Sequence, residues 1–149
     1  MDLFKIFSIS GSGMAAQRSR MSVVAGNLAN TETTRSPDGG PYRRRDVIFQ
    51  AVPAEGEFSE RLADLSDRPN DAQGVKVVGV KQSIRPPRKI FDPAHPDANP
   101  EGYVSLPDIN PIEEMVDMLS AARSYEANLS AYNTTKSLIR KILDIGRNP

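Results

Sequence analysis

Few residues of this sequence have the type and spacing that chemistry requires, and the first candidate is the single histidine. His95 lies between Asp92 and Asp97, and one imidazole with two carboxylates could supply ligands to a metal ion. This set would leave the coordination sphere open, in a stiff segment with prolines at positions 93, 96 and 100. We therefore expect no metal site. The absence of cysteine excludes disulfides, thiolate metal sites and a cysteine nucleophile.

Glycines and serines near the N-terminus could suggest a phosphate-binding loop. Gly11-Ser12-Gly13 falls inside a helical pattern, however, whereas a phosphate-binding loop follows a strand. No serine or lysine has the spacing from a base that would mark it as a nucleophile. We expect a protein that is not an enzyme, with no catalytic residue, no cofactor and no small-molecule substrate.

The most concentrated charge is a run of arginines after a turn-forming segment. Arg43, Arg44 and Arg45 follow residues 36–41, and a second basic block occupies residues 76–89. These bases could contact nucleic acid, or they could line a loop that touches a protein partner. The formal net charge is zero and aromatic residues are not interleaved with the bases, which disfavours nucleic acid. An ordinary solvated loop is the simplest alternative.

The element that must position these residues is a long C-terminal helix. Asn110 is a suitable N-cap, Pro111 suits the first helical position, and Glu113 lies three residues after the cap. No proline or glycine follows until Gly146, which we expect to end the helix in the left-handed conformation. The pattern predicts one uninterrupted helix over residues 110–146.

Apolar residues recur along this helix in steps of three and four. This heptad spacing is typical of a helix that packs along another long helix. Residues 3–30 carry a second seam of the same kind, weakened by Gly11, Gly13 and Gly26. We expect the two helices to pair as a coiled coil. The C-terminal seam consists of Met115, Met118, Ala122, Tyr125, Leu129, Tyr132, Lys136, Ile139 and Leu143, and the N-terminal seam of Leu3, Phe7, Ser10, Met14, Gln17, Met21, Val24 and Leu28.

The middle of the chain has the pattern of short strands. Residues 47–52 and 75–80 are β-rich runs ended by proline or glycine, and residues 88–91 and 103–106 add shorter ones. An acidic connector spans residues 55–71. We expect an α+β fold in which two terminal helices flank a small, mostly antiparallel β-rich insertion. The domain boundaries are 1–34 for the N-terminal helix, 35–108 for the loop and β-rich part, and 109–149 for the C-terminal helix.

Zero net charge conceals blocks of opposite sign. Residues 55–71 hold six acids and two bases, residues 76–89 hold five bases and no acid, and residues 92–108 hold four acids and no lysine or arginine. Patches of both signs on one subunit suit head-to-tail contacts between like subunits. Neutralisation of these blocks within one chain is the alternative.

No apolar run approaches the roughly 18 residues of a membrane span, so we expect no membrane insertion. The segment from Leu3 to Phe7 is short and charged, and no clear cleavage site follows it. We therefore expect no cleaved signal peptide.

Three segments resemble the bacterial flagellar rod–hook family of axial proteins. The first includes Asn27-Leu28-Ala29-Asn30-Thr31 and resembles the family's N-terminal Asn-Ile/Leu-Ala-Asn motif. The second, residues 35–44, is similar to a loop that distinguishes one member from its relatives. The third includes Gly102-Tyr103-Val104 and residues 110–128 and resembles the family's C-terminal segment.

This resemblance implies a structural subunit of the flagellar basal-body rod, in its proximal part. Such a subunit would assemble with copies of itself and with other rod proteins into a helical tube between motor and hook. The resemblance also implies export to the periplasmic rod through the flagellar type III apparatus. A soluble cytosolic coiled-coil adaptor is the alternative. The residues expected at assembly contacts are Met14, Met21, Val24, Asn27, Leu28, Asn30, Arg43, Arg44, Met118, Tyr125, Leu129, Tyr132 and Ile139.

Overall fold

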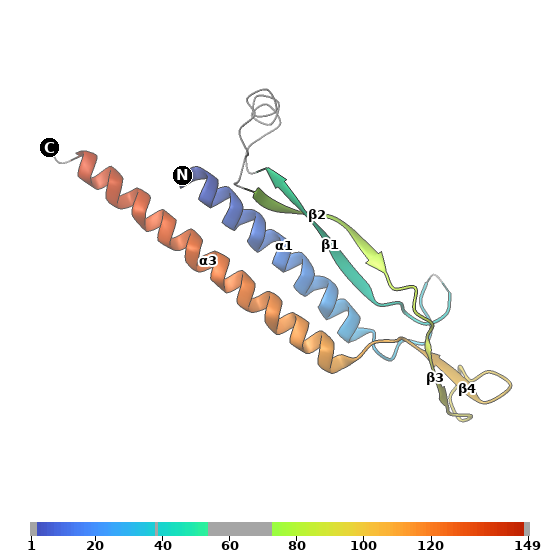
Figure 1. Cartoon of the computed structure of the whole chain (residues 1–149). Coiled ribbons are helices and arrows are strands. Elements are labelled where there is room, and N and C mark those ends of the chain that lie inside the picture. The colour runs from blue at the N-terminus through green and yellow to red at the C-terminus, as the bar shows by residue number, and fades with distance from the viewer. Residues whose placement is uncertain (1–2, 38, 54–72, 148–149) are drawn as a thin grey trace, which may run out of the picture. The chain divides into compact units, whose positions relative to one another are not determined.

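In the order of the chain, the elements of the described residues are a long helix, four strands and a second long helix (Figure 1). The computed structural model describes residues 3–37, 39–53 and 73–147. The predicted α+β class is confirmed, and the predicted connector at 55–71 lies outside the described residues. The elements are α1 (Leu3–Ala29), β1 (Arg45–Pro53), β2 (Gln73–Gln82), β3 (Arg88–Phe91), β4 (Tyr103–Leu106) and α3 (Pro111–Arg147).

The N-terminal cap of α3 forms as its sequence predicts. The Ile112 amide donates a hydrogen bond of 3.1 Å to the side-chain oxygen of Asn110, and the Asn110 amide group donates to Glu113 at 3.2 Å. The first bond satisfies a backbone amide at the helix start that has no partner within the helix, and the second holds the Asn110 side chain in place. The cap thereby fixes where α3 begins.

The predicted end of α3 at Gly146 is wrong. Among the described glycines only Gly39, Gly40 and Gly102 have positive φ angles, and the helix continues through Arg147. A left-handed glycine ends a helix when the residues beyond it fold back and bond the last carbonyls. Because glycine also tolerates helical angles, its presence alone does not stop the helix.

The chain divides into two compact units, and each contains part of both helices. The first unit comprises residues 1–19, 49–78 and 121–149, and the second comprises residues 20–48 and 79–120. In the first unit, the ring centroids of Phe7 and Tyr132 lie 4.5 Å apart in an edge-to-face arrangement. In the second unit, Arg20 pairs with Asp117 at 3.0 Å.

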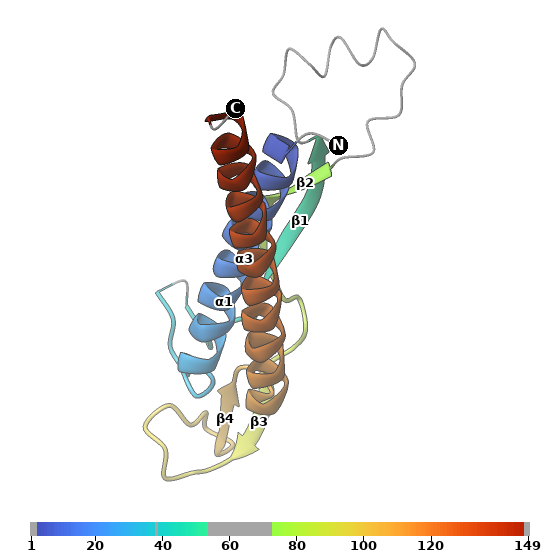
Figure 2. The same cartoon turned by 90° about the vertical axis from the view of Figure 1, so that its left-hand side faces the viewer.

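Within the first unit, α1 and α3 run antiparallel and approach closely (Figures 1 and 2). A Cβ atom added to Gly13 would lie 2.9 Å from the side-chain oxygen of Asn128, so the missing side chain makes room for that amide. Ala16, Ala121, Ser10 and Thr135 are buried in the same unit. The side chain of Ser12 accepts a 3.1 Å hydrogen bond from the Val75 amide, which ties α1 to β2.

The four strands form two separate two-stranded sheets, β1–β2 and β3–β4. In the antiparallel β3–β4 hairpin, Ile90 lies opposite Val104 and Phe91 opposite Tyr103. Gly102 has a φ angle of 82°, and a Cβ atom there would lie 2.8 Å from the Phe91 ring. Glycine is therefore required at this position both for the backbone and for the ring.

The predicted seam of α3 consists of two sets of residues, each with seven-residue spacing. One of these sets is not the set that is buried within the chain. Met115, Leu129 and Leu143 belong to this set, and their side chains are exposed by 51%, 39% and 66%. The prediction that these three residues pack against the other helix of the chain is therefore wrong. The buried row instead has the same seven-residue spacing one position earlier. It consists of Glu114, Ala121, Asn128 and Thr135, of which all but the half-buried Asn128 are fully buried.

Small residues on α1 explain this choice of row. Gly13 and Ala16 allow the two helices to approach closely, so that only short side chains of α3 fit between them. The other predicted row, with Met118, Tyr125, Tyr132 and Ile139, is half-buried. Many large apolar side chains of α3 thus remain exposed to solvent.

Candidate functional site

The most completely bonded cluster in the second unit is centred on Asn27, in the last turn of α1. Its side-chain nitrogen donates to the carbonyl of Arg45 at 2.8 Å and to Glu114 at 2.9 Å. Its side-chain oxygen accepts from the Arg45 amide at 2.9 Å and from the Tyr42 hydroxyl at 3.1 Å. These four bonds use the full hydrogen-bonding capacity of an amide side chain. Asn27 is 0% exposed, so water cannot replace any of them.

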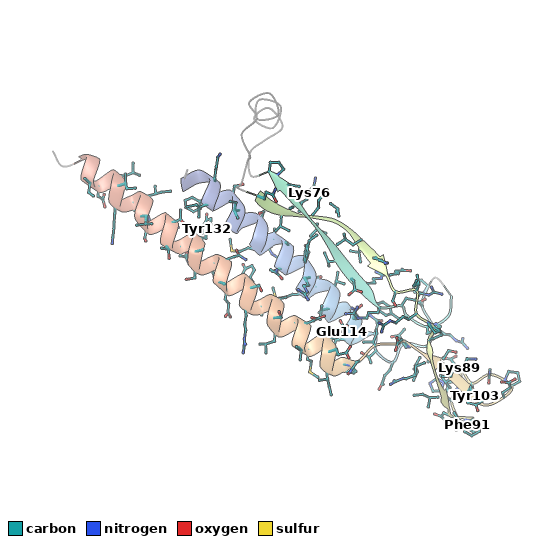
Figure 3. The ribbon with its side chains drawn as sticks, in the orientation of Figure 1. Lys76, Lys89, Phe91, Tyr103, Glu114 and Tyr132 are labelled. Carbon is teal, nitrogen blue, oxygen red and sulfur yellow. The ribbon has the colours of Figure 1, made fainter. Side chains whose placement is uncertain are left out.

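Glu114 is the second member of this cluster and lies in the first turns of α3 (Figure 3). It is 1% exposed and accepts from Asn27 through one oxygen and from the Arg44 guanidinium, at 2.5 Å, through the other. Arg44 also pairs with Asp46 at 2.6 Å and lies 3.5 Å from Asp117. A buried carboxylate is tolerated only when it is paired and hydrogen-bonded in this way.

The surroundings of the cluster shift two of its titratable groups. Burial alone would lower the pKa of Arg44, but its hydrogen bond to Glu114 and the charges of its acidic neighbours outweigh burial and raise that pKa. Burial raises the pKa of the Tyr42 hydroxyl; the charge of Arg45 opposes this rise and that of Glu114 adds to it. Arg44 therefore stays charged and Tyr42 stays protonated over the ordinary pH range.

A smaller polar contact joins two loops of the same unit. The Thr34 hydroxyl donates to Asp97 at 2.6 Å, and Arg35 forms an ion pair with the same carboxylate at 2.5 Å. The hydrogen bond from Thr34 is the largest influence and lowers the pKa of Asp97; burial opposes it, and the positive charge of Arg35 acts in the same direction as Thr34. This contact fixes the loop after α1 against the turn between β3 and β4.

The hydrogen bonds of these groups indicate that they stabilise the fold. Asn27, Glu114 and Arg44 are bonded to one another, to nearby backbone or to neighbouring carboxylates. In the part of the chain that the structure describes, no group of three histidine, aspartate or glutamate side chains could hold a metal ion. The Nδ1 atom of His95 accepts the Asp97 amide hydrogen at 3.0 Å. Neither described helix combines the length and the apolar run needed to cross a membrane.

The residues predicted for assembly contacts are distributed over both units. Val24 and Asn27 are buried inside the chain, whereas Arg43 and Leu129 are exposed. Those that the structure brings together are Asn27 and Arg44, through Glu114. The half-buried ones are Met14, Met21, Leu28, Asn30, Arg44, Met118, Tyr125, Tyr132 and Ile139. Their role in assembly stays a prediction.

Glu114 and Tyr42 were not predicted from the sequence as members of this cluster. Glu114 is also one of two acids in the first turn of α3, which suits a helix dipole without any partner. A signal was available in the seven-residue spacing from Glu114 to Ala121, Asn128 and Thr135. Such a row has no periodic signal among the large apolar residues, because its members are small or polar.

Comparison with known proteins identifies the setting of this cluster. Residues 7–35, which include Asn27, match the family described as "Flagella basal body rod protein". Residues 101–145, which include Glu114, match "Flagellar basal body rod FlgEFG protein C-terminal". The flagellar basal-body rod protein FlgC of Bacillus subtilis is 43% identical, over 99% of this chain and 100% of its own length. The chain belongs to the FlgC family of flagellar basal-body rod proteins.

Other FlgC proteins are similar over the whole chain as well. FlgC of Borreliella burgdorferi is 42% identical over 97% of this chain and 98% of its own length. FlgC of Salmonella typhimurium is 40% identical over 99% and 100%. The predicted resemblance is thereby confirmed, and so is the prediction of a structural rod subunit that is not an enzyme. As a FlgC family member, the chain is a component of the flagellar basal-body rod.

Proposed function

We propose that this rod subunit joins copies of itself and other rod proteins through the apolar residues of α3 that its own chain leaves exposed. Large apolar side chains are exposed near both ends of this helix, with Leu129 between the two groups, and Ile145 is 75% exposed. Clusters of exposed large apolar side chains on a folded chain are typical of interaction sites. The exposed large apolar residues of α3 are Ile112, Met115, Val116, Leu119, Leu129, Leu138, Ile142, Leu143 and Ile145.

In this proposal the interior of each unit sets the shape of the subunit, and the exposed apolar residues of α3 make the contacts between subunits. The buried polar cluster supports such a division of labour, because Asn27 and Glu114 are already satisfied within one chain. The terminal helices, residues 1–34 and 109–149, would act as the packing domain. The β-rich part, residues 35–108, would make lateral or outer contacts.

The proposal includes export through the flagellar type III apparatus without a cleaved signal. Glycines at positions 11, 13 and 26 lower the helix propensity of residues 3–29, and a helix that is marginal alone can pass a narrow channel unfolded and fold on its neighbours. Mass spectrometry of the chain from isolated basal bodies should recover the peptide that contains residues 3–18.

Hydrogen exchange of the full chain tests the assembly role most directly. The exchange is measured on the purified chain and again within isolated basal bodies. We expect residues 3–29 and 111–147 to exchange faster in the purified chain than in the basal bodies, where they become protected. Protection of both helices already in the purified chain, together with absence of the chain from basal bodies, would favour a cytosolic adaptor.

A substitution of one exposed apolar residue of α3, compared with the same substitution at an exposed polar residue, tests the role of this helix. Leu143→Lys places a charge where the proposal requires an apolar contact, and Asn133→Lys places the same charge at an exposed polar position of the same helix. We expect the first variant to be produced but missing from basal bodies, and the second to be incorporated. Equal incorporation of the two would contradict the role given to α3.

A further inference from the structure

An open groove in the second unit is lined by arginines. It has a volume of about 670 Å³, and Arg35, Arg43 and Arg45 line it together with Tyr42, Asn30 and Gln82. No acidic residue is among the described residues around it. The groove therefore presents positive charge to whatever enters it.

Two of these arginines keep their charge available. Arg35 is neutralised by Asp97, on the side of the loop that faces the β3–β4 turn. Arg43 and Arg45 are exposed, and neither forms an ion pair within the described residues. The Arg45 guanidinium lies 5.5 Å from the centre of the Tyr42 ring, a cation–π distance that holds it in place. A guanidinium held in this way is prepared for a carboxylate.

The same unit carries the complementary surface on the turn between β3 and β4. Asp92 and Glu101 are exposed there, and residues 92–108 contain no lysine or arginine. Backbone hydrogen bonds within the turn, from Ala98 to His95 at 3.0 Å and from Gly102 to Asn99 at 2.8 Å, give it a fixed form. The hairpin that carries the turn is marked by Phe91 and Tyr103 in Figure 3. A fixed turn loses little conformational entropy on binding.

We propose that the groove of Arg43 and Arg45 binds the acidic β3–β4 turn of a second copy of this chain. The pairing of Arg35 with Asp97 inside one chain shows that this loop and this turn are chemically matched. Groove and turn lie on one subunit as different patches, so their contact is heterologous and can repeat along a helical assembly. The zero net charge of the chain disfavours a polyanion as the occupant. The inference rests on the proposed assembly role.

Cysteine pairs test this contact without background, because the chain has no cysteine of its own. One tagged copy carries Arg43→Cys and a differently tagged copy carries Glu101→Cys, and the two are produced together. Oxidation of isolated basal bodies should give a disulfide-linked dimer with both tags. The control pair combines Arg43→Cys with Lys76→Cys, an exposed position on β2, and should give none.

The possible failures are distinguishable. If both copies are present in the basal bodies and the first pair links no better than the control pair, the inference is overturned and the proposed function stands. If the wild-type chain is itself missing from basal bodies, the proposed function fails and the inference with it.

Charge reversal gives an independent measurement. Arg43→Glu and Glu101→Arg should each reduce the amount of chain in basal bodies, and the two together in every copy should restore it. A double variant no better than the single ones would overturn the proposal, since two different partners would then be involved.

Discussion

The side chains of Asn27 and Glu114 are joined by a buried hydrogen bond of 2.9 Å that links the last turn of α1 to the first turns of α3. The residues are 87 positions apart in the chain, and both are inaccessible to solvent. Because no water can substitute, each depends on the other for a partner. The bond therefore couples the end of α1 to the beginning of α3 within the second unit.

Removal of the Asn27 amide should loosen the start of β1. Asn27→Ala leaves the Arg45 amide without its acceptor, at a cost of about 2 kcal/mol or more. This corresponds to roughly 30-fold faster hydrogen exchange for residues 43–49 in isolated basal bodies. Asn133→Ala removes the same side chain from an exposed site and should change nothing. Unchanged exchange in Asn27→Ala would contradict the importance of the cluster.

Glu114 and Arg44 should be energetically coupled. Breaking a buried ion pair costs about 3–5 kcal/mol, and because Arg44 is 27% exposed we expect about 2–4 kcal/mol for Glu114→Ala. Glu114→Gln keeps an acceptor and should cost less. The urea concentration that unfolds the chain in basal bodies measures both, with Glu126→Gln, at an exposed site, as the control. If Arg44→Gln and Glu114→Gln prove additive in the double variant, the two side chains are not coupled.

Gly13 and Gly11 should respond in opposite directions to the same substitution. Ala is favoured over Gly in a helix by about 1 kcal/mol, and nothing lies within 4 Å of the Cβ position at Gly11, so Gly11→Ala should stabilise α1. Gly13→Ala would push against the Asn128 amide, which donates to the Ser124 carbonyl at 2.8 Å, and should destabilise the first unit.

The double variant Gly13→Ala with Asn128→Ala provides the check on this explanation. It removes the amide that the new methyl group meets, and should restore much of the protection of α1 from hydrogen exchange. A Gly13→Ala chain as well protected as Gly11→Ala would show that the helices do not approach closely at this point.

The contact between Thr34 and Asp97 should depend on pH. The hydrogen bond from Thr34 lowers the pKa of Asp97 below 3.8, so the ionised carboxylate is favoured in the folded chain. Its stabilising contribution is complete above the unfolded pKa and is lost as the pH falls through the lower, folded pKa. The carboxyl carbon shift of Asp97 should titrate below 3.8, and Thr34→Val should raise the midpoint. Identical midpoints in the two chains would exclude the hydroxyl as the cause.

Much of the fold follows from local sequence. The cap at Asn110, the apolar spacing of α1 and α3, and the β-rich runs at 47–52 and 75–80 were sufficient to predict both helices and the first two strands, because each depends on neighbours in the chain. The two short strands of the hairpin were predicted by the same rule. The strand positions are thus a local property here.

The candidate site was harder to predict because its members are distant in sequence. Asn27 and Arg44 were expected at assembly contacts, but their common partner Glu114 is more than 60 residues further along the chain. The buried row of α3 contains glutamate, asparagine and threonine, which carry no apolar signal. Only the small residues of the facing helix make that row the better fit.

The full use of the Asn27 amide has a mechanical consequence for the second unit. Its hydrogen bonds hold within a few tenths of an ångström and weaken steeply outside that range. If α1 and α3 slid past each other by one residue, about 1.5 Å, the bond to Glu114 would have to break. The contact between the two helices at Asn27 and Glu114 should therefore resist small shear forces with little displacement. It should break abruptly when the force exceeds the strength of these hydrogen bonds.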